Sequence, residues 1–364
     1  MERMKVNSKP LFTDITWGAG GSTADLSLLL ALYLHNTGHV SNMHLTCTNM
    51  DRSKLVTALR SAYDGGIRNI VALRGDPPAG EEEWHATENG FTCALDLVKY
   101  IRSEFGSAFG ISVAGYPEGH PDAIEEVADV STLTENEKTR SSVRDGVAYV
   151  CREEKYAKEL AYLKEKVDAG ADLILTQMFF DVEVFGHFVK DCRKIGIMCP
   201  IIPGIMCINA YAGFVRMTKF CKTRVPEWLS QKMEKLKADA AAMKQFGIEF
   251  GIQTCRRLVE LGVEGLHFYT LNLENAVYGI TDGLGWTANL SKHAHLDADA
   301  KSMAAVGSAW ARVGDVVKSV YGIGTVRDMR NDGTAVIILT SWQLAGGQNP
   351  TAFLQKGTYQ KVFN

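Results

Sequence analysis

The amino-acid sequence predicts an α/β fold with a parallel sheet, and three observations support this prediction. Short apolar runs alternate with longer amphipathic stretches, which is typical of strand–helix–strand units. Glycine repeatedly follows a predicted helix just before the next apolar run. Polar side chains gather where the apolar runs end. Apolar strands with helices outside them suit either a doubly wound sheet or a β/α barrel.

Seven apolar runs have the length and composition of buried strands. In chain order they are Leu11–Thr16, Val40–Thr46, Asn69–Leu73, Phe109–Ala114, Leu173–Gln177, Pro200–Pro203 and Gly265–Tyr269. Six stretches have the periodicity of amphipathic helices, namely Ala24–Leu34, Ser53–Tyr63, Ala94–Phe105, Tyr156–Ala169, Val182–Ile195 and Ala238–Leu261. A closed barrel needs eight β/α units, and about seven precede Trp286.

Three junctions repeat one pattern: "YDGGIRNIVAL", "VDAGADLILT" and "VELGVEGLHF". Each places glycine just past the end of a helix, where the backbone turns left-handed, and then begins the next strand. Three copies of one supersecondary unit favour a barrel.

Two segments interrupt the alternation. Residues 119–155 are polar, charged and too long for an ordinary connection, so we expect a surface excursion or a partly disordered segment. Residues 287–312 have the character of a linker that ends the first domain, residues 1–286. Residues 313–364 carry short β runs separated by the turns "YGIG" and "RNDG", which predicts a small β-barrel-like module.

Composition and charge narrow the class of function. The net charge is −3, which gives no basic field for nucleic acid. No long apolar run suggests a membrane span, and no signal peptide opens the chain. The eight cysteines form no C-x-x-C pair, which indicates free thiols in a reducing compartment. We therefore expect a cytoplasmic protein with neither nucleic acid nor membrane as partner and no metal site, while a homo-oligomer stays open.

The ends of the predicted strands carry most of the polar chemistry. In "NIVALRGDPP" an apolar strand stops in Arg74, Gly75 and Asp76. Other strand ends carry Thr16, His44, Tyr116, His120, Gln177 and Tyr269. The loops at these ends form the active sites of β/α barrels. Because no nucleophile–base order, metal cluster or pair of facing acids stands out, this set suits a planar ligand with phosphates better than hydrolysis.

Each of these residues also has an ordinary structural explanation. Asp76 could cap a turn, Arg74 could pair with a nearby carboxylate, and His44 could be a hydrogen-bonded core histidine. The segment "WGAGGST" lacks the dinucleotide spacing G-x-G-x-x-G and could be a turn before a helix N-cap. Their joint placement at strand ends outweighs these separate explanations.

Seven motifs, in this order along the chain, resemble the methylenetetrahydrofolate reductases: "DITWGAGGST", "MHLTCTNM", "NIVALRGDPP", "VAGYPEGHPD", "LKEKVDAGADLILTQMFFD", "PIIPGIM" and "LHFYTLN". The resemblance runs from about residue 9 to 286 and is to the eukaryotic-type catalytic domain. It implies a TIM-type (β/α)8 barrel that binds FAD non-covalently and reduces 5,10-methylenetetrahydrofolate to 5-methyltetrahydrofolate, with NADH or NADPH as electron donor.

The resemblance also implies roles for ten residues. Those at cofactor-binding positions are Thr16, His44, Arg74, Gly75, Asp76, Tyr116, His120 and Lys166, and those at substrate-binding positions are Gln177 and Tyr269. Arg74, Lys166 and His120 can meet the pyrophosphate and ribose of FAD. Asp76 is also the implied catalytic residue, because a fixed negative charge beside the flavin stabilises the cationic iminium formed from the folate.

The chain departs from the family pattern in three places. The family begins with a strand close to "FEFFPP", whose glutamate is the general acid, whereas this chain begins "MERMKVNSKPLF". The resemblance therefore implies that the first β/α unit and its acid are missing, with Glu118 and Asp14 as the first candidates to replace the acid. Leu273 stands where many relatives carry arginine, and the residues after Trp286 do not resemble the S-adenosylmethionine-binding domain of eukaryotic relatives.

The leading interpretation is a methylenetetrahydrofolate reductase barrel that lacks its first β/α unit, followed by a small C-terminal β-rich module. One alternative is an FAD-binding barrel that is inactive in folate reduction because the glutamate is absent. Another is an interaction protein, which flavin binding would exclude. The C-terminal module, with Trp342, is expected to bind a partner or another copy, or else to be a passive appendage.

Overall fold

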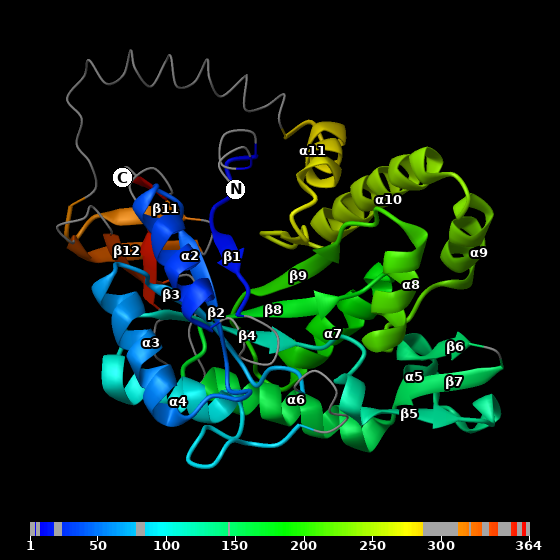
Figure 1. The fold of residues 1–364 in the computed structure, drawn as a ribbon, viewed down its shortest axis with the longest axis horizontal. Helices are drawn as coiled ribbons and strands as arrows, with labels where there is room; N and C mark the ends of the chain where they lie inside the picture. The colour runs from blue at the N-terminus through cyan, green and yellow to red at the C-terminus, as the bar shows by residue number, and fades with distance from the viewer. Residues whose placement is uncertain are drawn as a thin grey trace.

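The computed structural model describes residues 4, 8–17, 24–77, 84–144, 146–286, 312–319, 322–329, 335–340, 351–354 and 359–361. Its central element is a parallel sheet of seven strands in the order β1-β2-β3-β4-β8-β9-β10 (Figure 1). These strands are β1 (Thr13–Ile15), β2 (Ser41–Thr46), β3 (Asn69–Leu73), β4 (Gly110–Gly115), β8 (Leu173–Met178), β9 (Ile201–Met206) and β10 (His267–Tyr269). The predicted parallel sheet is confirmed.

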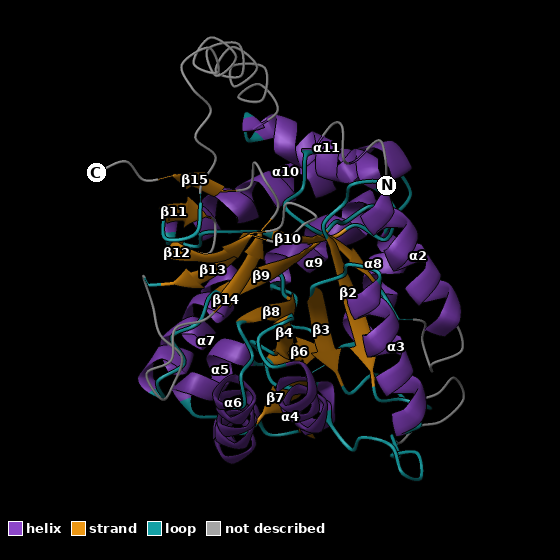
Figure 2. Cartoon of the chain, turned by 90° about the vertical axis from the view of Figure 1, so that its left-hand side faces the viewer, coloured by secondary structure: helices purple, strands orange, loops and turns teal. Residues whose placement is uncertain are grey.

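Helices cover the outside of this sheet (Figure 2). They are α2 (Ala24–Asn36), α3 (Arg52–Asp64), α4 (Ala94–Phe105), α6 (Glu153–Asp168), α7 (Val182–Lys194), α8 (Tyr211–Phe220), α9 (Glu227–Leu236), α10 (Ala240–Glu260) and α11 (Glu274–Gly283). The six predicted helices are present, each with ends within about three residues of the expected ones. Helices α8, α9 and α11 were not predicted.

The three predicted glycine junctions adopt the expected backbone. Gly66, Gly170 and Gly262 follow α3, α6 and α10 with φ of +89°, +115° and +85°. Only glycine adopts this left-handed region without a steric cost. Each junction turns the chain from an outer helix back to the next strand.

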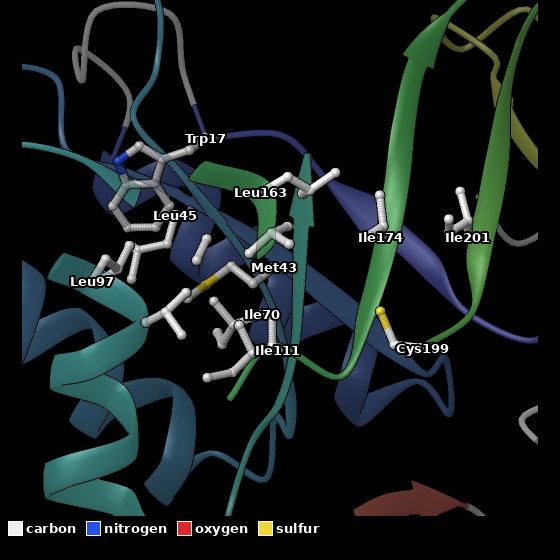
Figure 3. Packing of buried hydrophobic residues seen from close by; sticks show 14 of the residues in the cluster. Trp17, Met43, Leu45, Ile70, Leu97, Ile111, Leu163, Ile174, Cys199 and Ile201 are labelled. Carbon is white, nitrogen blue, oxygen red and sulfur yellow. The ribbon is translucent and has the colours of Figure 1, made fainter. Parts of the chain in front are cut away.

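A continuous apolar core lies between the sheet and its helices (Figure 3). Met43, Leu45, Ile70 and Ile111 from three neighbouring strands are fully buried. Fully burying one such side chain contributes about 1.5–3 kcal/mol. This core fixes the strands whose carboxyl ends carry the polar side chains.

The sheet curls so that its first and last strands are joined through side chains. His267 Nε2 on β10 lies 2.8 Å from Asp14 Oδ2 on β1, and the ring of Phe12 stacks on His267 with 6.1 Å between centroids. Among the described strands, β1 and β10 pair through the main chain only with β2 and β9. The curled β/α architecture expected for a barrel lacking one β/α unit is confirmed.

The interruption at residues 119–155 is an ordered insertion. It contains the antiparallel sheet β5-β7-β6 and one helix, with the bounds β5 (Ile124–Val127), α5 (Glu135–Arg140), β6 (Ser142–Arg144) and β7 (Val147–Cys151). Leu133, Ala148 and Val150 give it a small core of its own. The possibility of partial disorder is therefore wrong for its described residues, because alternating apolar side chains on β7 supply that core.

The C-terminal region forms a second, antiparallel sheet in the order β14-β13-β12-β11-β15. Its strands are β11 (Val316–Ser319), β12 (Gly322–Met329), β13 (Ala335–Leu339), β14 (Thr351–Leu354) and β15 (Tyr359–Lys361). Val317, Val326 and Ile337 pack in its core. The predicted β-rich module is confirmed, while Trp342 lies outside the described residues and the domain boundaries stay predictions.

All eight cysteines are free thiols, and all but Cys93 are buried. In the part of the chain that the structure describes, no helix is both long enough and apolar enough to cross a membrane.

Candidate active site

One cavity of about 510 Å³ lies at the carboxyl ends of the parallel strands. This volume falls within the range of small-molecule and cofactor sites. All ten residues that the sequence selected line it: Thr16, His44, Arg74, Gly75, Asp76, Tyr116, His120, Lys166, Gln177 and Tyr269. They come from six strands or strand ends and from α6, so the fold gathers residues that are far apart in the sequence.

The tip of β3 is held rigidly beside this cavity. Gly75 has φ of +91°, and a Cβ there would lie 2.4 Å from Thr48 Oγ1. Thr48 Oγ1 donates to the main-chain oxygen of Asp76 at 2.9 Å, and Trp84 Nε1 donates to Thr48 Oγ1 at 2.7 Å. Only glycine fits between these groups, which explains why a glycine separates Arg74 from Asp76 at the end of a core strand.

Arg74 and His120 line the cavity, and each lies beside the carboxylate of Asp122. Arg74 Nη1 lies 3.0 Å from Asp122 Oδ2, and its guanidinium stands over the ring of Trp84 at 5.5 Å. His120 Nδ1 lies 3.4 Å from the same Asp122 oxygen, and burial lowers the pKa of His120 to about 4. The Asp122 carboxylate thus stands where an anionic ligand group would meet Arg74.

Lys166 is a buried amine that also lines the cavity. Its Nζ donates to the main-chain oxygen of Ala114 at 3.0 Å and stands over the ring of Tyr162 at 4.9 Å. Burial lowers the pKa of Lys166 to about 8, although Glu159 opposes this shift. A buried ammonium with one main-chain partner has donors left for an anionic ligand.

Asp76 is one of three acids among the described residues that line the cavity, together with Asp122 and Glu159. Solvent reaches much of this residue, yet its carboxyl lies within the cavity wall, so desolvation raises its pKa against the opposing charge of Arg74. Burial and the charge of Asp76 also raise the pKa of the Tyr116 hydroxyl. A ligand ring bound here would meet one fixed acid and one neutral phenol.

Gln177 of β8 and Tyr269 of β10 also line the cavity. Gln177 Oε1 accepts from the main-chain nitrogen of Met178 at 3.0 Å, and its amide NH2 group makes no hydrogen bond to the described part of the chain. Tyr269 donates its hydroxyl to the main-chain oxygen of Thr176 at 2.8 Å. A Cβ at Gly204 would lie 2.5 Å from the Tyr269 ring, so the small residue makes room for it.

A buried ionic cluster joins two of the cavity residues. Asp14 Oδ1 lies 3.0 Å from His44 Nε2 and accepts from Asn42 Nδ2 at 2.8 Å, while Asp14 Oδ2 lies 2.8 Å from His267 Nε2. Burial alone would raise the pKa of Asp14, but the two imidazoles outweigh it and hold that pKa well below its usual range. Asp14 is therefore an ionised carboxylate bridging His44 and His267.

Of the two candidate replacements for the family acid, Glu118 does not line the cavity. Its Oε2 accepts from the main-chain nitrogen of Arg224 at 2.6 Å, and burial raises its pKa to about 8. Asp14 is the reverse case, because its depressed pKa leaves it without a proton at neutral pH. Glu118 is therefore outside the cavity, and Asp14 carries no proton to donate, so neither carboxyl is suited to act as the acid.

Several cavity residues escaped the sequence analysis. Glu159, Tyr162 and Lys166 lie on one face of α6, and their spacing of three and four residues could have revealed the first two. Asp122 follows "EGHP" directly and carried no signal of its own. His267 lies inside "GLHFYT", where its partner Asp14 stands 253 residues away in the sequence.

Comparison with known proteins shows which sequences this chain resembles. Residues 1–285 match the sequence model of the family "Methylenetetrahydrofolate reductase". A protein of Oryza sativa subsp. japonica, "Probable methylenetetrahydrofolate reductase (NADH)", is 48% identical over 286 residues, which cover 78% of this chain and 44% of that protein. "Methylenetetrahydrofolate reductase (NADH) 1" of Arabidopsis thaliana is 49% identical over 286 residues, which cover 78% and 45%.

A bacterial protein is similar over most of its own length. The "5,10-methylenetetrahydrofolate reductase" of Salmonella typhimurium is 34% identical over 280 residues, which cover 76% of this chain and 81% of that protein. By contrast, the chain spans less than half the length of the two plant relatives.

Proposed function

The chain belongs to the methylenetetrahydrofolate reductase family, and from this premise we propose that it binds FAD non-covalently and reduces 5,10-methylenetetrahydrofolate to 5-methyltetrahydrofolate with NADH or NADPH. One observation carries the proposal. The ten residues that the family resemblance selects line a single cavity of suitable size. When bound, FAD supplies hydride transfer between the nicotinamide and the folate.

The residues of the cavity fit FAD in charge and in shape. Arg74 offers a planar fork and Lys166 a buried ammonium, which suit the two phosphates. Gly75 lines the cavity with its main chain, because Thr48 occupies the space that a side chain there would need. Tyr116 and His120 pack edge to face with 4.7 Å between ring centroids and present aromatic surface beside these cations.

Asp76 is proposed as the residue that acts on both ligands. Its carboxylate disfavours added negative charge on a flavin ring beside it, which eases release of hydride. The same carboxylate stabilises the cationic iminium that forms from the folate. Desolvation raises the pKa of Asp76, and binding of a cation beside it would favour its ionised form.

Gln177 and Tyr269 are proposed to hold the folate. The free amide NH2 of Gln177 is suited to hydrogen bonds with the pterin ring. The Tyr269 ring is fixed by its hydrogen bond to Thr176 and offers a flat apolar surface. NADH is the electron donor to assay first, because the names of the plant relatives specify it.

The proposal is tested with the 364-residue chain reconstituted with FAD. We expect NADH or NADPH oxidation that depends on added methylenetetrahydrofolate, with 5-methyltetrahydrofolate formed in equal amount. Gln177→Leu should raise the KM for the folate while leaving the nicotinamide-dependent reduction of FAD unchanged. Gln231→Leu on the exposed face of α9 is the matched control.

The alternative of a flavin-binding barrel inactive in folate reduction gains no support from the relatives, whose names all specify the reductase. The same assay decides it. Bound FAD that is reduced by NADH or NADPH but not reoxidised by methylenetetrahydrofolate would favour the alternative over our proposal.

A further inference from the structure

The Asp14 cluster contains chemistry that the cofactor and folate contacts leave unused. Its carboxylate accepts from Asn42 and faces one ring nitrogen of each histidine, His44 and His267, at 3.0 and 2.8 Å. All three side chains of the ionic pairs are largely buried, with exposed fractions of 12% for Asp14, 14% for His44 and 8% for His267. A buried carboxylate with titratable partners beside a cavity is an arrangement that suits proton transfer.

The cluster fixes which nitrogen of His267 can exchange a proton with a ligand. Because Asp14 is ionised, Nε2 of His267 must carry hydrogen to make the 2.8 Å contact. Nδ1 of His267 is then the remaining site, and it is buried without a hydrogen-bond partner among the described residues. His267 lines the cavity, and a ligand that uncovers Nδ1 as it binds could supply the partner that this buried nitrogen lacks.

The proposed reaction needs a proton at one defined point. Opening the five-membered ring of methylenetetrahydrofolate breaks the bond between N10 and the methylene carbon, and N10 must take a proton as it leaves. Asp14 has no proton to give at neutral pH, and Glu118 lies outside the lining of the cavity. A histidine supported by a carboxylate can carry this proton.

We propose that His267 is the residue that protonates the folate, and that Asp14 is the positioning residue that holds it in the required state. This inference rests on the proposed function. The proton leaves Nδ1 of the His267 imidazolium for N10, the electron pair of the broken bond stays on N10, and the methylene carbon becomes the iminium. That carbon accepts hydride originating from NADH or NADPH. Neutral His267 regains a proton from solvent, which accounts for the one proton that the reaction consumes.

The groups around His267 set the expected pH dependence. From β1 it faces Asp14, and through the shared carboxylate it faces His44 on β2. On the same strand, the ring of Tyr269 lies edge-on to His267 with 4.9 Å between ring centroids. Tyr116, directly after β4, contributes to the raised pKa of Tyr269. Both phenols are held neutral by burial, so Asp14 is the one ionised group in contact with His267 among the described residues.

The test separates the two half-reactions by stopped-flow absorbance of the FAD-loaded chain. His267→Gln should slow folate-dependent reoxidation by about 10²-fold or more, because loss of a general acid costs about 10²–10⁴ in rate. Its reduction by NADH should stay close to that of the parent. His187→Gln on the exposed surface of α7 is the matched control and should change neither step.

Asp14→Asn distinguishes positioning from simple structural support. Without the carboxylate the imidazolium is less stable, so the fall in reoxidation rate with rising pH should occur at lower pH than in the parent. Nitrogen NMR of labelled histidine gives a readout independent of activity. We expect the neutral form of His267 to carry hydrogen on Nε2 in the parent and to lose this preference in Asp14→Asn.

The outcomes keep this inference apart from the proposed function. If the parent binds FAD and completes both half-reactions while His267→Gln reoxidises as fast as the parent, the inference is overturned and the function stands. A parent that does not bind FAD contradicts the function instead. Hydrogen on Nδ1 in neutral His267 would overturn the assignment of Asp14 in either case.

Discussion

Two buried aspartates of the same sheet have opposite electrostatic environments. Asp172 lies at the amino end of β8, where its Oδ2 accepts from Arg102 Nη2 at 2.6 Å and from the main-chain nitrogen of Ile111 at 2.7 Å. Burial raises the pKa of Asp172 even though Arg102 opposes the shift. Asp14 is equally enclosed, yet its two histidine partners hold its pKa below the usual range.

The difference between these aspartates lies in their partners. Arg102 is permanently charged and also donates to the main-chain oxygens of Gly106, Phe109 and Gly170, so it holds the two turns that precede β4 and β8. His44 and His267 carry imidazoles and line a cavity, and imidazole is the side chain that proteins most often use to move protons. The buried acid that is paired with arginine stabilises the fold, whereas the one that is paired with two histidines lies beside a cavity, where its partners can meet a ligand.

The largest expected effect is on stability, at the amino end. Arg102→Ala leaves Asp172 buried without its charge partner and frees three main-chain oxygens, which should cost about 3–5 kcal/mol in the free energy of unfolding. Urea unfolding followed by circular dichroism measures this cost. FAD affinity of the molecules that remain folded should match the parent. A loss below about 1 kcal/mol would place Arg102 among ordinary surface ion pairs.

At the carboxyl end the expected effect is on binding. Arg74→Ala should weaken FAD binding by about 1.5–3 kcal/mol, because charge-assisted hydrogen bonds to the phosphates are lost. Its stability should change little, since the Arg74–Asp122 pair is partly exposed. Fluorescence titration of FAD gives the dissociation constant, with Arg60→Ala on the exposed face of α3 as the control. Equal FAD affinities in the two variants would mean that Arg74 does not contribute to FAD binding.

Glu118 offers a third buried acid that sharpens the comparison. Burial raises its pKa from about 4.5 to about 8, so between these pH values the folded chain keeps a proton that the unfolded chain has released. The free energy of unfolding therefore rises as the pH falls through this range, because of Glu118, by at most about 1.4 kcal/mol per pH unit. Glu118→Gln should flatten the dependence of unfolding free energy on pH between about 5 and 8.

The matched control for this experiment is Glu126→Gln, since Glu126 is exposed on β5. It should retain the pH dependence of the parent. A Glu118→Gln profile that overlays the parent would mean that Glu118 is ionised in the folded chain.

The smallest expected effect concerns the C-terminal module. Deleting residues 305–364 should leave FAD affinity unchanged, because the described residues that line the cavity all lie between Thr16 and Tyr269. The same titration measures it. A large loss of affinity would indicate that the module supports the cavity, for which the approach of β14 to β4 offers a route.

Local patterns explain what the sequence alone could predict. Strand runs such as Asn69–Leu73 and the glycine junctions are encoded by neighbouring residues. Because strand ends in a parallel sheet share one edge, nine of the ten cavity residues could be selected together, whereas Lys166 on α6 came from the family resemblance alone. The insertion escaped prediction because its core needs Leu133 to meet Ala148 and Val150 across a turn and a helix. The partnership of Asp14 with His267 spans nearly the whole sheet and leaves no local signal.

The measurement that tests the central claim most directly is retention of FAD by the purified, folded chain. The protein is incubated with excess FAD, desalted, and compared by flavin absorbance with its protein concentration. We expect about one FAD per chain, released on denaturation and diminished in Arg74→Ala but not in Arg60→Ala. A chain that is folded by circular dichroism and retains no flavin would contradict the assignment of the carboxyl-end cavity as a cofactor site.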